Sequence, residues 1–304
     1  MRWLAKFVMS SRGNAILIAS ASAVIALAAR PLTPFSYLGG AVIALVTLRL
    51  GCREGLLLLA AAALGTAVLG QLVLGQGLSA VLATLFLWVP SWLLALLLRS
   101  SGSLPITMQG AALLGVMALF GVYLAYGDPA PWWQTVLEPV MEPMLERSGI
   151  TMAPEQWLRR AAEMMTGILV GATMLGLIMT LYLARAWQAM LYNPGGFRGE
   201  FHGLRLKPAL GWATLGLVVL GQLGDGLVAT LAMQTAVILL VLYFLAGLAL
   251  VHGTVGLLGA HTGWLVAVYI LLLVVPPQTM LFLGLAGLTD SWLDFRGRLR
   301  KTHS

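Results

Sequence analysis

Seven polar residues interrupt long apolar stretches of the sequence, and they are the first places to look for chemistry. They are Gln71, Gln222, Asp225, Gln234, His252, His261 and Gln278. Polar side chains are costly inside a lipid bilayer, so one within an apolar segment suggests a site that binds a ligand or moves a proton. The residues that we take as candidates for contacting a small ligand are Gln71, Trp88, Gln222, Asp225, Gln234 and His252.

Simpler explanations compete at two of these positions. Asp225 lies between Gly224 and Gly226, a pattern typical of a tight turn between two helices. His252 opens a second predicted turn, 252–254, and His261 follows nine residues later. That spacing puts the two imidazoles on opposite faces even of a continuous helix, which disfavours a metal pair or a proton relay.

The sequence shows no combination of residues typical of an enzyme active site. Asp290 and Asp294 share a helical face, and paired carboxylates can do acid-base work. Arg298 follows Asp294 by four residues, so a solvated helix end with an ion pair explains the pattern more simply. The sequence shows no Ser-His-Asp or Cys-His arrangement, and Cys52 is its one cysteine. We predict no enzyme, no metal site and no cofactor.

The amino-acid composition indicates whether the segments that carry these residues lie in water or in a membrane. Hydrophobic residues make up 60% of the 304 residues and charged residues only 10%, and the mean hydropathy is +0.91. A soluble domain carries about a quarter charged residues. Runs such as 56–69 lack the alternation of membrane barrel strands. We therefore predict an all-α, multi-pass inner-membrane protein, with one integral membrane domain over 1–304.

Apolar segments recur at lengths near the about 20 residues that cross a bilayer as a helix. Ten candidates are 14–29, 35–50, 55–74, 78–98, 106–126, 158–184, 208–223, 227–251, 255–275 and 278–288. Several are short, so some pairs could form half-helices or hairpins. The sequence predicts a transmembrane helix bundle of eight to ten hydrophobic segments, with an even number of crossings.

Basic residues indicate the topology, because cytoplasmic loops of membrane proteins are enriched in them. An even number of crossings with the N-terminus inside puts fourteen of the 18 Lys and Arg in the cytoplasm, all but Arg30, Arg147, Arg159 and Arg160. Both termini are therefore predicted cytoplasmic, with a basic tail at 291–304. This topology explains the net charge of +7, so no nucleic-acid partner is predicted.

The longest polar interruption, 127–157, then forms an outer, periplasmic loop. Apolar side chains recur at helical spacing over 133–144, while Glu138, Glu142 and Glu146 occupy another face. This pattern is typical of an amphipathic segment on the outer leaflet, which Pro139 and Pro143 should kink or break. The segment could be an interfacial anchor, held by its tryptophans, or a lid over a ligand pocket.

The main cytoplasmic loop, 187–207, contains the turn signal Asn193-Pro194-Gly195-Gly196, followed by interleaved aromatic and basic residues over 197–202. It lacks the Lys-Ser/Thr ending of a phosphate-binding loop. We interpret it as a connection between helices, with a docking surface for a cytoplasmic partner as the alternative.

The first apolar segment carries a row of small residues. Ala15, Ala19 and Ala23 repeat every four residues, and such rows let membrane helices approach closely. This candidate face serves either packing within the chain or contact with a partner protein.

Stretches of the C-terminal third carry a resemblance to a known family: 201–207, 243–254 with its His252-Gly253, and 284–296. The last closes on Gly-Leu-x-Asp-x-Trp-x-Asp-Phe-Arg, formed by Gly287, Asp290, Trp292, Asp294, Phe295 and Arg296. The chain resembles the YybS-like family of bacterial polytopic membrane proteins, which its N-terminal half matches by hydropathy alone.

That family is distantly similar to the substrate-capture subunits of energy-coupling-factor transporters. The small-residue first helix of those subunits packs on a coupling subunit, and the resemblance implies that Ala15, Ala19 and Ala23 fill that place. The chain departs from them by having more than six hydrophobic segments and a long outer loop.

The sequence thus predicts a transport-type protein that captures a small molecule from outside. It has no nucleotide-binding motif, so it would need separate coupling or ATPase subunits as partners, besides the lipid bilayer. A membrane scaffold that binds other membrane proteins and a lipid-handling protein are the alternatives. A scaffold should be packed solid, whereas a capture subunit should hold a cavity.

Overall fold

The computed structural model describes residues 1–29, 34–148 and 154–303, and this part of the chain contains fourteen helices and no strand. The predicted all-α class is confirmed. The chain divides into two compact units: unit 1 is Met1–Ala111 with Leu175–Gly203, and unit 2 is Ala112–Met174 with Leu204–Ser304. The single membrane domain of the sequence analysis stays a prediction, and each unit is described by itself.

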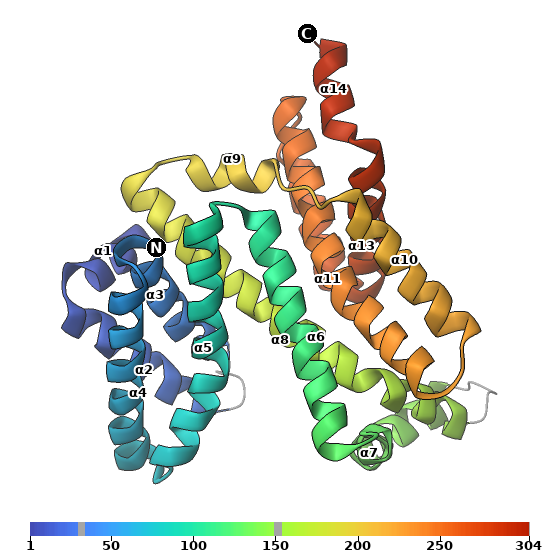
Figure 1. The fold of residues 1–304 in the computed structure, drawn as a ribbon, viewed down its shortest axis with the longest axis horizontal. Coiled ribbons are helices and arrows are strands. Elements are labelled where there is room, and N and C mark those ends of the chain that lie inside the picture. The colour runs from blue at the N-terminus through green and yellow to red at the C-terminus, as the bar shows by residue number, and fades with distance from the viewer. Residues whose placement is uncertain (30–33, 149–153, 304) are drawn as a thin grey trace. The chain divides into compact units, whose positions relative to one another are not determined.

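Figure 1 shows the course of the helices. Unit 1 contains α1 (Arg2–Ser10), α2 (Arg12–Ala28), α3 (Phe35–Leu50), α4 (Cys52–Leu74), α5 (Gly77–Ser101) and α9 (Gly196–His202). Unit 2 contains α7 (Ala130–Ser148), α10 (Pro208–Leu223), α11 (Gly226–Leu257), α12 (Gly263–Val274), α13 (Pro276–Leu293) and α14 (Phe295–His303). Each unit also takes part of α6 (Leu104–Tyr126) and of α8 (Pro154–Tyr192).

Five of the described helices are long and apolar enough to cross a membrane: Cys52–Leu74, Gly77–Ser101, Leu104–Tyr126, Glu155–Tyr192 and Gly226–Leu257. Four shorter apolar helices are Arg12–Ala28, Phe35–Leu50, Pro208–Leu223 and Gly263–Val274. Large apolar side chains on several of these helices are exposed, such as Leu72 and Leu124, as expected where the solvent is lipid. The chain is a multi-pass helical membrane protein, while the count of eight to ten segments stays a prediction.

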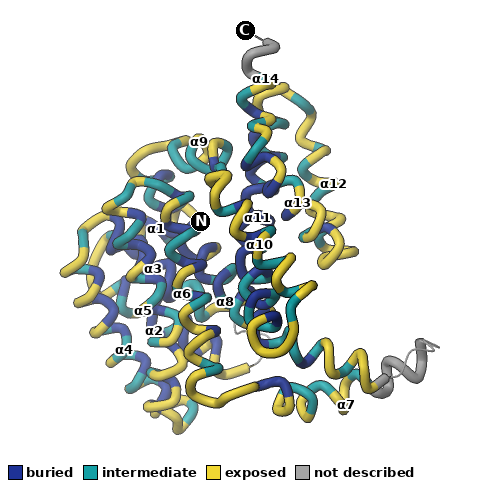
Figure 2. Tube along the Cα trace, turned by 45° about the vertical axis from the view of Figure 1, so that its right-hand side comes forward, coloured by how far each residue is buried: buried dark blue, intermediate teal, exposed yellow. Residues whose placement is uncertain are grey.

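Helix α3 forms the centre of unit 1. It is buried at every position over 39–48, including two adjacent glycines (Figure 2). A Cβ at Gly39 would lie 2.7 Å from the Trp88 indole, so the glycine makes room for this ring. Arg99 of α5 donates to the Leu48 carbonyl at 2.6 Å, which satisfies a backbone group at the end of α3. Contacts of this kind fix α3 against α5.

In unit 2, α11 packs along α13 through glycines, and the two helices run side by side in Figures 1 and 2. A Cβ at Gly247 would lie 2.6 Å from the Leu283 carbonyl carbon, and one at Gly287 would lie 2.6 Å from the Gly247 nitrogen. These glycines therefore bring two backbones into direct contact, as small residues do in membrane proteins.

Two expectations about helix ends are wrong. His252 does not open a turn, because the apolar sequence around it continues α11 to Leu257. The last part of the predicted 255–275 segment then forms only the 12 residues of α12.

Within the segment 127–157, which the sequence predicts to be an outer loop, the structure describes α7 and the start of α8. Helix α7 continues through Pro139 and Pro143, so the predicted break does not occur. A proline removes a single helical hydrogen bond, and the neighbouring turns keep theirs. The predicted acidic positions Glu142 and Glu146 lie outside the described side chains.

Candidate functional site

A pocket of about 480 Å³ lies in unit 2, where α6, α8 and α11 meet. Its volume falls within the range typical of small-molecule sites. The lining residues are Phe120, Tyr123, Leu124, Gly127, Asp128, Glu163, Gly226, Leu227, Thr230 and Leu231. Apolar side chains thus surround a few polar groups, and we call this cavity the polar pocket.

The ends of α6 and α11 supply one side of the polar pocket. Gly127 ends α6 in a left-handed conformation, with φ 72°, and its N–H donates to the Tyr123 carbonyl. Asp128 follows, and its Oδ1 accepts from the Ala130 N–H at 3.0 Å, which leads the chain into α7. The turn after α6 therefore places the Tyr123 phenol and the Asp128 carboxylate in the lining of the polar pocket.

Gln234 of α11 joins the three helices behind the pocket. Its Nε2 donates to the Tyr123 hydroxyl at 2.8 Å and to the Glu163 backbone carbonyl at 2.5 Å. Helix α8 approaches closely at Gly167, where a Cβ would lie 2.7 Å from Gln234 Cβ. Gln234 is 1% exposed, and its Oε1 has no hydrogen-bond partner among the described residues. An unpaired buried acceptor costs about 1–3 kcal/mol, so this position has an unused capacity to accept a hydrogen bond.

The polar pocket carries negative charge. Two carboxylates, Asp128 and Glu163, line it, and no basic residue does. Arg159 pairs with Glu163 at 3.5 Å, but its side chain is 74% exposed, and such exposed pairs are worth little. The arrangement suits a small molecule that presents a protonated amine to the carboxylates and apolar surface to the walls.

Trp133 anchors α7 to the helix that carries Glu163. Its Nε1 donates to the Thr166 hydroxyl of α8 at 2.8 Å, while Trp132 packs edge-on against Trp133 and is itself 60% exposed. The two tryptophans of the predicted anchor therefore differ, since Trp133 bonds to the protein and Trp132 remains exposed.

Of the six candidate ligand residues, Gln234 alone bonds to groups of the polar pocket. Trp88 is buried in unit 1, where its Nε1 donates to the Ser36 carbonyl at 3.3 Å. The exposed Gln71 accepts from the Gly77 N–H and so caps the turn after α4. Gln222 and Asp225 are exposed near the α10–α11 turn, with Asp225 at the N-cap position of α11.

His252 lies away from the polar pocket, within α11. Its Nε2 is 2.9 Å from the Tyr269 hydroxyl of α12, and the two rings meet edge to face. This contact holds α12 beside α11. No group of three or more metal-ligating side chains occurs within the described part of the chain.

The sequence analysis missed the two acids as pocket residues. Glu163 lies inside the predicted 158–184 segment and carries the same signal that selected Gln234, a polar group among apolar residues. Asp128 was assigned to the outer loop. Tyr123 and Thr230 have no distinguishing sequence signal.

The small-residue row packs within the chain. Ala15, Ala19 and Ala23 are at most 1% exposed. Nearby, Ser20 of α2 donates to the Ala62 carbonyl of α4 at 3.0 Å. A partner protein cannot reach these alanines while unit 1 keeps this packing.

The residues of the C-terminal pattern 287–296 form a junction at the end of α13. Asp290 pairs with Arg296 at 2.7 Å, and both are buried. Arg296 also donates to the Leu204 carbonyl at 2.7 Å, and Phe295 donates its N–H to Asp290 Oδ1. Gly287 lies one helical turn earlier, against α11. The motif joins α13 and α14 to the segment that precedes α10.

Two further contacts complete this junction. Trp292 packs against Trp212 of α10, with ring centroids 5.0 Å apart. Asp294 pairs with Arg205 at 3.1 Å, a partner that local sequence spacing did not predict. Asp294 ends α13 in a left-handed conformation, φ 48°, so it does not share a helical face with Asp290.

Comparison of the chain with protein-family models, with curated proteins and with solved structures finds no match.

Proposed function

We propose that this protein is a transport-type capture subunit of the bacterial inner membrane, which binds a small amine-bearing molecule in the polar pocket. The observation that carries the proposal is the pocket itself, a cavity of about 480 Å³ with two carboxylates among apolar walls. A scaffold protein has no use for such a cavity. Resemblance to the YybS-like family agrees with this function, and the coupling or ATPase subunits are separate proteins.

The predicted topology supports capture from the outer side. With both termini in the cytoplasm, α6 ends and α11 begins at the periplasmic side, and these are the ends that line the polar pocket. A ligand arriving from the periplasm then meets Asp128 and Glu163 first. Eight to ten crossings accommodate this arrangement.

The topology is tested with cysteines. In intact cells, a membrane-impermeant maleimide should leave the exposed Cys52 unlabelled and should label Asp225→Cys in a Cys52→Ser background. Permeabilised cells, in which both should react, are the control. A reporter active only in the cytoplasm should work when fused after Ser304. The reverse labelling pattern would contradict the topology.

Ligand capture is tested by mass spectrometry of small molecules that copurify with the protein in lipid nanodiscs. Wild type should carry an amine-bearing compound, and Glu163→Gln should carry about tenfold less. Losing one charge-assisted hydrogen bond costs about 1.5–3 kcal/mol, and 1.4 kcal/mol corresponds to a factor of ten.

The matched control for this test is Glu155→Gln, because Glu155 is exposed on the same helix and does not line the pocket. It should retain the compound at the wild-type level. Equal recovery from Glu163→Gln and wild type would contradict capture at this site. Copurification of an ATPase pair would favour transport over other uses of the pocket.

A further inference from the structure

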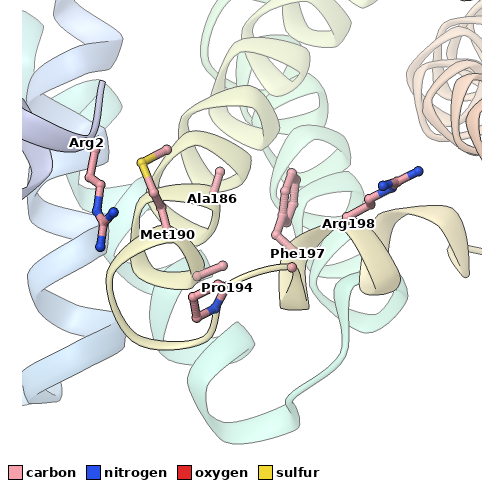
Figure 3. A pocket seen from close by; sticks show the side chains of 8 residues that line it. Arg2, Ala186, Met190, Pro194, Phe197 and Arg198 are labelled. Atoms are coloured by element: carbon pink, nitrogen blue, oxygen red, sulfur yellow. The ribbon is translucent and has the colours of Figure 1, made fainter. Parts of the chain in front are cut away.

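A second pocket, of about 380 Å³, lies in unit 1 (Figure 3). Its walls are largely apolar, and an arginine stands on either side of them in the figure. The lining residues are Arg2, Ala186, Ala189, Met190, Pro194, Gly195, Phe197 and Arg198. They come from the start of α1, the last turns of α8, and the turn into α9. We call it the arginine pocket.

The elements around the arginine pocket are held in place. Phe197 packs on Tyr182 of α8, with ring centroids 5.6 Å apart. Arg185 of α8 forms a two-pronged ion pair with Glu200 of α9, with Nε 2.9 Å from Oε2. Gly195 makes the turn between the two helices with φ 86°. The pocket is therefore built on fixed walls.

Charge in this unit is strongly unbalanced. The sequence of unit 1 contains nine Lys or Arg and two Glu, a net of +7, which equals the net charge of the whole chain. Both acids are already paired, Glu54 with Arg12 and Glu200 with Arg185. Arg2 and Arg198 are exposed, and neither has an ion pair with a described residue. Two guanidinium groups thus remain available to an anion.

Helix α1 has the form of a helix that lies at a membrane surface. Ala5 and Val8 are buried, while Arg2 and Lys6 are exposed. Trp3 is 74% exposed and stacks on Phe7. Exposed tryptophan beside basic residues is typical of the boundary between lipid headgroups and acyl chains.

We propose that the arginine pocket binds the headgroup of an anionic phospholipid from the cytoplasmic leaflet. The guanidinium groups of Arg2 and Arg198 lie on opposite sides of the apolar walls (Figure 3), and either one can donate to the phosphate, for which arginine provides planar, paired donors. The apolar walls take the glycerol and the first acyl carbons, which a free phosphate ion does not have. The interfacial form of α1 places Arg2 at the depth of the headgroups.

The test measures lipid binding to the full chain by native mass spectrometry, with phosphatidylglycerol and phosphatidylcholine of the same acyl composition. Wild type should bind phosphatidylglycerol at least tenfold more tightly than phosphatidylcholine. Arg2→Gln and Arg198→Gln should each reduce that preference, and the double variant should abolish it. The matched control is Arg53→Gln, which removes an equally exposed charge of unit 1 that does not line the pocket.

A second variant tests the walls rather than the charge. Ala186→Trp fills the arginine pocket and keeps both guanidinium groups, so it should weaken phosphatidylglycerol binding while the thermal unfolding temperature stays near that of wild type. If this variant does not fold, the arginine variants still decide the question.

Four results would overturn the proposal. The first is equal binding of the two lipids to wild type. The second is a loss in Arg53→Gln as large as in Arg198→Gln, which would show a general effect of charge. The third is displacement of the lipid by millimolar inorganic phosphate, which would assign the site to a free anion. A dimer that the arginine variants dissociate, with no lipid preference, would likewise assign the pocket to a second copy of the chain.

Discussion

Asp290→Ala is expected to lower the free energy of unfolding by about 3–5 kcal/mol. Asp290 is 2% exposed and Arg296 is 5% exposed, and their side chains meet at 2.7 Å. The substitution leaves a buried guanidinium without its carboxylate, and a buried charge that has lost its partner is far more costly than one in water. It also removes the acceptor for the Phe295 N–H at the start of α14.

The measurement is equilibrium unfolding in mixed detergent micelles. The matched control is Arg12→Gln, which breaks the pair between Arg12 and Glu54; Arg12 is 76% exposed there, so the loss should stay below about 1 kcal/mol. Replacing both buried partners, Asp290→Leu with Arg296→Met, should recover most of the loss, because no unpaired charge remains. A single variant as stable as wild type would mean that the pair contributes nothing to the fold.

This junction shows what sequence spacing can and cannot predict. The pattern at the end of α13 was singled out, but Asp294 was assigned to Arg298, its neighbour at helical spacing. The structure pairs Asp294 with Arg205, 89 residues earlier in the chain, which the spacing did not predict. Such a pair depends on where α10 starts relative to the end of α13, and local periodicity carries no information about that distance.

Most of the helices follow from local pattern alone. Apolar length predicts α4, α5, α6 and the long α11, because a span needs only enough apolar residues to cross lipid. The ends are harder to predict. The turn predicted at 252–254 does not form, because α11 continues through Gly253 to Leu257, and a single glycine costs only about 1 kcal/mol within a helix.

None of the polar residues that line the polar pocket was among the predicted ligand residues, whereas Gln234, which bonds to two of them from behind the pocket, was. Gln234 was identified because an amide inside an apolar segment is costly. Its partners Tyr123 and Glu163 are 111 and 71 residues away in the sequence, and only the packing of α6, α8 and α11 brings them together. Trp88 shows the converse error, since a large aromatic side chain that seemed suited to a ligand fills the space above Gly39.

The second large effect is expected at the contact of α11 with α13, where Gly287→Ala should lower the free energy of unfolding by about 2–3 kcal/mol. The added methyl group would lie 2.6 Å from the Gly247 nitrogen and also against the Tyr243 carbonyl oxygen. Both are backbone atoms of α11, so no side chain can rotate away, and the two helices must separate.

Gly216→Ala is the matched control, because it makes the same chemical change in a helix of the same unit, at a position with no neighbour within 4 Å of the new methyl group. It should be neutral, or stabilising by up to about 1 kcal/mol, since alanine is the better helix former. The difference between the two variants therefore isolates the cost of helix separation from the gain in helix propensity. Equal stability of both would contradict direct backbone contact between α11 and α13, whereas loss in Gly287→Ala alone would show that this contact holds the C-terminal helices together.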